Sequence, residues 1–131
     1  MQSILVVDDH DYTREMICRF LKELGYHSEQ ANCGQQAFAR IREVEFDLVL
    51  LDIYMEDCDG LALVRKIKLQ KEMSLFVMMS AAGYAEDKQL ARDLGALSFL
   101  VKPFEFSELK DLLEAVLPIP KFEDTWQLSA S

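Results

Sequence analysis

The sequence predicts an α/β fold, a doubly wound five-stranded parallel sheet with five helices. Two observations support this prediction. Short, unbroken apolar runs recur along the chain, and such runs are typical of strands buried on both faces of a parallel sheet. Segments with apolar residues at helical spacing lie between the runs, so that strands and helices alternate as right-handed βαβ crossovers require.

The strands are expected where the apolar runs lie. The four clear runs occupy residues 4–7, 48–51, 75–79 and 99–101. A weaker and more polar run at 27–31 is expected to form a fifth strand at an edge of the sheet.

The helices are expected where apolar residues repeat every three or four positions. The five apolar stripes lie within residues 16–24, 37–44, 61–67, 90–94 and 106–117. Gly25 and Gly95 follow the first and fourth stripes and favour helix ends there, and Ser107 is the candidate N-cap of the last helix. Two prolines end that helix. We therefore expect a domain at 1–117 and a C-terminal extension, or the start of a linker, at 118–131.

Composition limits the partners and the setting of this domain. Acidic residues outnumber basic ones by 23 to 14, and the resulting net charge of −9 argues against direct binding of nucleic acid or an anionic membrane. A divalent cation or a basic protein surface is a more natural partner. The sequence has no CxxC motif, no signal-peptide pattern and no apolar run of about 20 residues. We expect a cytoplasmic domain with neither a zinc site nor a membrane span.

Polar side chains follow four of the predicted strands. Asp8 and Asp9 follow the first strand, Asp52 the third, Ser80 the fourth and Lys102 the fifth. Because the carboxyl ends of parallel strands meet at one edge of a sheet, we expect these groups to lie together. Clustered carboxylates favour Mg²⁺, and a carboxylate beside such a metal can attack phosphorus to form an aspartyl phosphate. The lysine and the serine would then bind phosphate oxygens.

The same residues carry a resemblance to a known family. Over about residues 1–117, the chain resembles a receiver domain of the two-component response regulators. The matching motifs are ILVVDD at 4–9, LVLLDIYM at 48–55, Asp59-Gly60, Ser80-Ala81 and Lys102-Pro103-Phe104, all in the family's order and spacing. The resemblance implies a flavodoxin-like, receiver-type fold.

The resemblance also implies a phosphorylation site and a metal site. Asp52 would be the phosphoacceptor. Asp8, Asp9, Asp52 and the backbone carbonyl of Tyr54 would bind Mg²⁺, or Mn²⁺ in its place. Glu56 stands where the family often has proline, and it adds a negative charge near the metal.

A switch that responds to phosphate is implied as well. Lys102 would bind the phosphoryl group, the hydroxyl of Ser80 would be drawn toward it, and Phe99 would rotate into the space that Ser80 leaves. Tyr54 and Ala82 would flank the path of an attacking water, which predicts slow autodephosphorylation.

These expectations describe a signalling switch. A sensor histidine kinase or a histidine phosphotransfer protein would donate the phosphoryl group to Asp52, and the domain would switch a surface that contacts a downstream protein target or an output domain. Phosphorylation-dependent dimerisation is compatible with this scheme. The domain would not be an enzyme, beyond catalysing its own phosphorylation and autodephosphorylation. An aspartyl phosphohydrolase is less favoured, because such enzymes usually carry a second acid where this chain has Tyr54.

Overall fold

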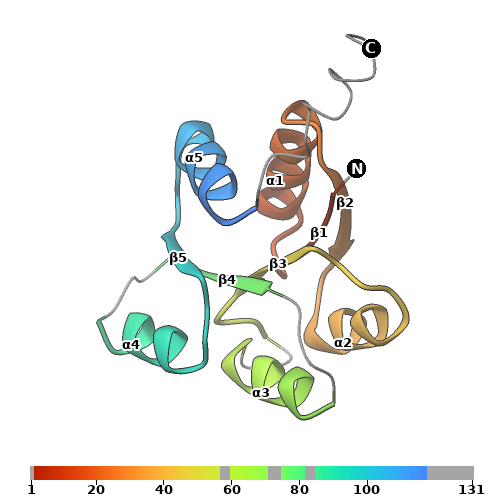
Figure 1. Ribbon diagram of the computed structural model, residues 1–131, viewed down its shortest axis with the longest axis vertical. Helices are drawn as coiled ribbons and strands as arrows, with labels where there is room; N and C mark the ends of the chain where they lie inside the picture. Colours follow the sequence, from red (N-terminus) through yellow and green to blue (C-terminus); the bar gives the residue numbers. More distant parts are fainter. Residues whose placement is uncertain (1, 57–59, 71–74, 82–84, 118–131) are drawn as a thin grey trace, which may run out of the picture.

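Strands and helices alternate along the chain, as Figure 1 shows. The computed structural model describes residues 2–56, 60–70, 75–81 and 85–117. The strands are β1 (Ser3–Val7), β2 (His27–Ala31), β3 (Leu48–Asp52), β4 (Leu75–Ser80) and β5 (Ser98–Val101). The helices are α1 (Asp11–Glu23), α2 (Gly34–Glu43), α3 (Gly60–Gln70), α4 (Ala85–Asp93) and α5 (Phe106–Val116).

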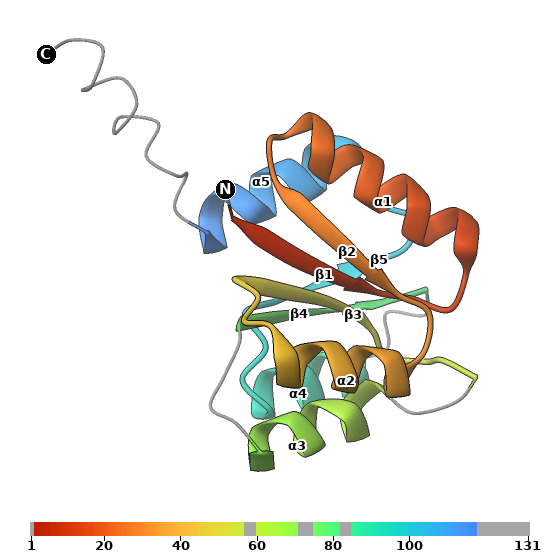
Figure 2. The same ribbon diagram turned by 90° about the vertical axis from the view of Figure 1, so that its right-hand side faces the viewer.

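All five strands form one parallel sheet in the order β2-β1-β3-β4-β5. Helices α1 and α5 cover one face of the sheet, and α2, α3 and α4 cover the other (Figure 1 and Figure 2). Because alternate residues of a strand point to opposite faces, Ile4 and Val6 belong to the core under α1 and α5, whereas Leu5 and Val7 belong to the core under α2 and α3. The predicted doubly wound fold is confirmed.

The predicted strands are confirmed, including the polar edge strand at 27–31. Two strands extend to a polar residue of the predicted site, since Asp52 is the last residue of β3 and Ser80 is the last residue of β4. The register pairs Asp52 with Met79, next to Ser80. The sheet itself therefore sets the backbone positions of both residues.

The helix ends follow the sequence prediction at two places and depart from it at one. Gly25 and Gly95 follow α1 and α4 with φ angles of 95° and 91°, the left-handed conformation that glycine adopts most readily. The prediction that Ser107 caps α5 is wrong. The helix begins at Phe106, so Ser107 is already within its first turn, and Glu105 is the N-cap without a side-chain hydrogen bond.

Within the described ranges, no helix is long and apolar enough to cross a membrane. Residues 118–131 lie outside the described residues, so the domain boundary near residue 117 stays a prediction.

Candidate functional site

Three strands deliver charged groups to one edge of the sheet. Asp8 directly follows β1, Asp52 ends the neighbouring strand β3, and Lys102 directly follows β5. The Nζ atom of Lys102 donates to Oδ2 of Asp8 at 2.9 Å and to Oδ2 of Asp52 at 3.0 Å. The structure thus brings together residues that are 50 and 94 positions apart.

The carboxylates at this edge are held by backbone groups as well. Oδ1 of Asp8 accepts from the N–H of His10 at 2.9 Å, and Oδ1 of Asp52 accepts from the N–H of Tyr54 at 3.2 Å. Asp8 is fully buried and Asp52 is 4% exposed. Both oxygens of each carboxylate therefore have a donor, as buried charged groups require.

Burial and charge act in opposite directions on the groups of this site. Burial raises the pKa of Asp52 above its ordinary value, and the neighbouring charge of Asp8 adds to the rise, although the bond from Lys102 opposes it. Burial alone would lower the pKa of Lys102, but its hydrogen bonds with Asp8 and Asp52 hold that pKa above the ordinary value. The lysine is therefore fully charged at neutral pH, and it balances two buried acids.

Asp9 is the third acid of the cluster, and one of its carboxylate oxygens accepts no hydrogen bond from the described residues. Its Oδ2 accepts from the N–H of Glu56 at 2.9 Å. Its Oδ1 is buried and accepts no hydrogen bond within the described residues, although Nδ1 of His10 lies 3.2 Å away. One potential ligand atom from each of Asp8, Asp9, His10 and Asp52 lies within 4.8 Å of the others.

This donor set fits a hard divalent cation. Three of the four side chains offer carboxylate oxygens, the ligands that Mg²⁺ prefers. Oδ1 of Asp9, which accepts no hydrogen bond from the described residues, is an oxygen that a cation would satisfy. His10 is 71% exposed. The Asp cluster is therefore suited to Mg²⁺ whether or not the imidazole takes part.

Arg14 is a residue that the sequence interpretation missed. It is 8% exposed on α1, and its guanidinium donates to the carbonyl oxygen of Asp8 at 2.8 Å, to Gln30 Oε1 at 2.8 Å and to Asp11 Oδ1 at 2.7 Å. It thereby anchors the backbone that carries the acids. Residue type does not separate a buried arginine from a solvated one; the available signal is spacing, which puts Arg14 on the helical face of Ile17 and Leu21, and that face is buried.

Gly60 brings the start of α3 against the strand end that carries Asp52. Its N–H donates to the carbonyl oxygen of Ile53 at 2.6 Å. A Cβ atom at this position would lie 2.8 Å from Cα of Ile53 and 2.9 Å from its carbonyl oxygen, closer than real Cβ contacts. The close backbone approach at Gly60 therefore leaves no room for a side chain, and Asp59, the other residue of the Asp59-Gly60 motif, lies outside the described residues.

The predicted switch residues lie on β4, which pairs with β3, and on β5, which pairs with β4. Ser80 is fully buried at the end of β4. Phe99 of β5 pairs with Met78 and is half-buried against the core under α2 and α3, and Nζ of Lys88 lies 6.0 Å from its ring centroid. Ala82, which the sequence placed beside the path of water, lies outside the described residues.

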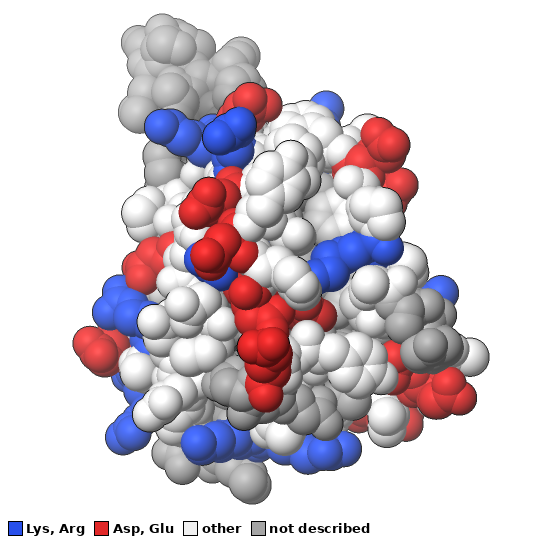
Figure 3. Space-filling model, turned by 180° about the vertical axis from the view of Figure 1, so that it is seen from behind, with Lys and Arg blue, Asp and Glu red and all other residues white. Residues whose placement is uncertain are grey.

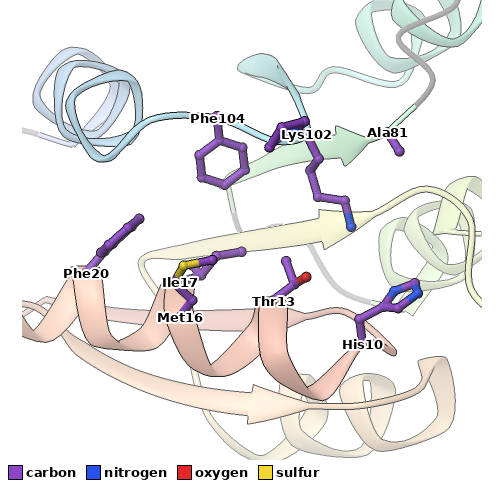
Figure 4. Close-up of a pocket in the computed structure, with 9 residues that line it drawn as sticks. His10, Thr13, Met16, Ile17, Phe20, Ala81, Lys102 and Phe104 are labelled. Atoms are coloured by element: carbon purple, nitrogen blue, oxygen red, sulfur yellow. The ribbon is translucent and has the colours of Figure 1, made fainter.

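An apolar cavity of about 330 Å³ opens beside the charged groups. Its wall is formed by Met16, Ile17 and Phe20 of α1 and by Phe104, which follows β5 (Figure 4). Lys102 and His10 lie along its rim toward the acidic cluster. The site therefore has an apolar surface next to its charged centre.

Fold and site together define a class of protein, a doubly wound α/β domain with an acidic pocket and a lysine at the carboxyl edge of its sheet. The profile of one family, the response regulator receiver domain, matches residues 4–114 of the sequence. The chain belongs to this family, the receiver domains of the two-component response regulators. The resemblance noted in the sequence is thus confirmed.

Two curated relatives show how such domains occur in different chains. Sporulation initiation phosphotransferase F of Bacillus subtilis is 32% identical over 118 residues, which cover 90% of this chain and 95% of the relative. The transcriptional regulatory protein ZraR of Escherichia coli is 38% identical over 115 residues, which cover 88% of this chain and 26% of the relative. The chain spans about a quarter of the length of ZraR.

Solved structures confirm the fold. Chemotaxis protein CheY4 of Vibrio cholerae superposes with a TM-score of 0.84 at 31% identity, covering 89% of this chain and 99% of that one. The response regulator TrrA of Thermotoga maritima, solved in complex with Mg²⁺-BeF, superposes with a TM-score of 0.80 at 32% identity, covering 89% of this chain and 100% of that one.

Proposed function

We propose that this receiver accepts a phosphoryl group on Asp52 from a sensor histidine kinase or a histidine phosphotransfer protein and then switches a protein-interaction surface. The observation that carries the proposal is the position of Asp52. This carboxylate ends a central strand, shares Lys102 with Asp8, and lies close to Oδ1 of Asp9, which accepts no hydrogen bond from the described residues.

The chemistry requires little from the protein beyond positioning and charge. The phosphorus–nitrogen bond of a phosphohistidine breaks as a phosphorus–oxygen bond to Asp52 forms, and the imidazole leaves with the bonding electron pair. Transfer of this kind is accelerated chiefly by alignment and by neutralisation of the phosphoryl oxygens. Lys102 would bind one of those oxygens, and its hydrogen bond to Oδ2 of Asp52 at 3.0 Å supports this role.

Mg²⁺, or Mn²⁺ in its place, is the cofactor that we propose. Asp8, Asp9, Asp52 and the backbone carbonyl of Tyr54 would hold it. When bound, the cation would neutralise charge on the phosphoryl oxygens and on the acidic cluster. The buried Oδ1 of Asp9 and the closeness of the carboxylates support this assignment.

Ser80 and Phe99 are the proposed switch residues. The hydroxyl of Ser80 would move toward the phosphoryl group, and Phe99 would turn into the space that it leaves. Two observations support this coupling. Ser80 is buried, and Phe99 pairs with a residue of β4, the strand that ends at Ser80. The surface formed by α4, β5 and α5 would then change its contacts, because a local change of charge can shift a larger element between two conformations.

The partners follow from the same scheme. A phosphodonor protein would approach Asp52, and a downstream protein target or an output domain would contact the switched surface. Phosphorylation-dependent dimerisation is compatible with this. The net charge of −9 favours basic protein partners over nucleic acid or an anionic membrane, and a cytoplasmic setting is in keeping with the free thiols of Cys18 and Cys33. Residues 118–131 would form an extension or the start of a linker.

Chemical labelling tests this function. Acetyl phosphate with Mg²⁺ is expected to add one phosphoryl group to the wild-type chain, detected by intact mass spectrometry and lost in base. Asp52→Asn should remove the labelling, because it keeps the shape of the side chain without a nucleophilic carboxylate. Equal labelling of both proteins would contradict the assignment of Asp52.

A further inference from the structure

Tyr54 is bonded both to the candidate phosphoacceptor and to α4. Its backbone N–H donates to Oδ1 of Asp52 at 3.2 Å. Its hydroxyl donates to Oδ1 of Asp87 at 2.7 Å. Asp87 lies in the first turn of α4, 33 positions further along the chain. One residue therefore joins the loop after β3 to the helix after β4.

Asp87 is buried to an extent that is rare for a carboxylate. It is 5% exposed, and its Oδ2 is buried with no hydrogen-bond partner in the part of the chain that the structure describes. A buried carboxylate that loses a hydrogen-bond donor still carries the full cost of its desolvation. The hydrogen bond from the hydroxyl of Tyr54 therefore stabilises the buried position of Asp87. Asp87 and Ala91 are the buried residues of α4. This bond is therefore a large part of what holds the first turn of the helix in place.

We propose that Asp87 is a positioning residue that holds Tyr54 and the loop after Asp52 against α4, and that phosphorylation of Asp52 releases this latch. The inference rests on the proposed function. A phosphoryl group on Asp52 changes the acceptor that the N–H of Tyr54 faces, so the loop backbone shifts and draws the hydroxyl away from Asp87. The first turn of α4 then opens more often, because few other buried contacts hold it.

Hydrogen exchange measured on α4 in the unphosphorylated protein tests the latch. Tyr54→Phe and Asp87→Ala are each expected to speed exchange in residues 85–93 about tenfold, the size of one hydrogen bond to a charged group. The double variant should exchange no faster than either single variant, because both substitutions remove the same bond. Asp87→Asn keeps an acceptor oxygen and should restore slow exchange. Glu86→Ala, which removes an exposed acid from the same turn, is the matched control and should resemble wild type.

The phosphorylated arm tests the release. After labelling with acetyl phosphate and Mg²⁺, exchange in α4 of the wild type should rise toward the level of Tyr54→Phe, while the variant should change little. Tyr54→Phe keeps the aromatic ring and removes only the hydroxyl. If α4 of this unlabelled variant exchanged at the same rate as in the wild type, the latch would be overturned, even if Asp87→Ala failed to fold. Labelling without any change in α4 would overturn the release. If mass spectrometry showed no phosphorylation of the wild type, the result would instead count against the proposed function. The proposed release, which depends on that function, would then be overturned as well.

Discussion

Asp52 is a carboxylate in surroundings that disfavour its charge. Burial and the neighbouring Asp8 raise its pKa, and the ammonium of Lys102 only partly offsets them. The protein thus keeps a carboxylate in a position that disfavours its charged form. A cost of this kind at a single residue is expected of a functional site.

The raised pKa of Asp52 predicts how Asp52→Asn changes stability with pH in the absence of metal. Below the ordinary aspartate pKa, the carboxyl is protonated in both the folded and the unfolded wild type, so the two proteins should be equally stable. As pH rises, the unfolded wild type releases its proton first, and its folded state loses stability. Asp52→Asn should therefore be the more stable protein at neutral pH. Urea melts at several pH values in EDTA check this, and a constant difference between the proteins would contradict it.

Gly60 predicts a second effect at the scale of one residue. Gly60→Ala places a methyl group against the backbone of Ile53, next to Asp52, and should cost about 1–3 kcal/mol of stability through overpacking. It should also slow labelling by acetyl phosphate, because the strand end that carries the acceptor must move.

The matched control for Gly60 is Gly25→Ala. Gly25 has a φ of 95°, and no atom lies within 4 Å of the place that an added methyl group would take. This substitution is therefore strained only by the backbone conformation, by about 1–2 kcal/mol. Denaturant melts should show a loss of stability in both variants, whereas only Gly60→Ala should label slowly. Slow labelling of Gly25→Ala as well would mean that lost stability alone explains the effect.

At the scale of elements, the loop between β1 and α1 predicts how metal stabilises the fold. Mg²⁺ should raise the free energy of unfolding by about 2–3 kcal/mol at a hundredfold excess over its dissociation constant, because it binds only the folded cluster. Asp9→Ala removes Oδ1, the carboxylate oxygen that accepts no hydrogen bond from the described residues, and should abolish most of this gain. Thermal melts with and without Mg²⁺ measure it.

The exposed Glu15 of α1 offers the control for this experiment. Glu15→Ala lowers the net negative charge by the same amount but should keep the full response to Mg²⁺. An unchanged response in Asp9→Ala would argue that the cation binds elsewhere.

The elements and the strand-end residues were predictable because they depend on local pattern. Apolar runs located four strands, and the shared direction of parallel strands brought Asp8, Asp52 and Lys102 to one edge although Lys102 lies 94 positions from Asp8. The polar strand at 27–31 was also predicted, from a weaker and more polar run of residues.

Contacts that depend on the path of a side chain were not predictable. A buried arginine such as Arg14 cannot be told from a solvated one by type. The bond between Tyr54 and Asp87 joins the loop after β3 to the first turn of α4, without a shared motif. Ser107 was chosen as a cap by residue type, but the helix begins one residue earlier. Tertiary packing decides such details, and local preference does not.

At the scale of the whole molecule, charge is unevenly distributed. Seen from the side opposite to Figure 1, acidic side chains form a band down the middle of the surface, and lysines and arginines lie around it, several of them along the lower edge (Figure 3). With a net charge of −9, such a surface attracts cations and basic protein patches over distances of about 8–10 Å at physiological salt. The distribution suits a domain whose centre binds a divalent cation.

The central claim is that a phosphoryl group is attached to Asp52 itself. Borohydride reduction of the labelled protein converts a phosphorylated aspartate to homoserine, and tandem mass spectrometry of the peptide that contains residue 52 locates the change. We predict homoserine at residue 52, and only after treatment with donor and Mg²⁺. Homoserine at Asp8 or Asp9 in its place, with residue 52 unchanged, would contradict the account.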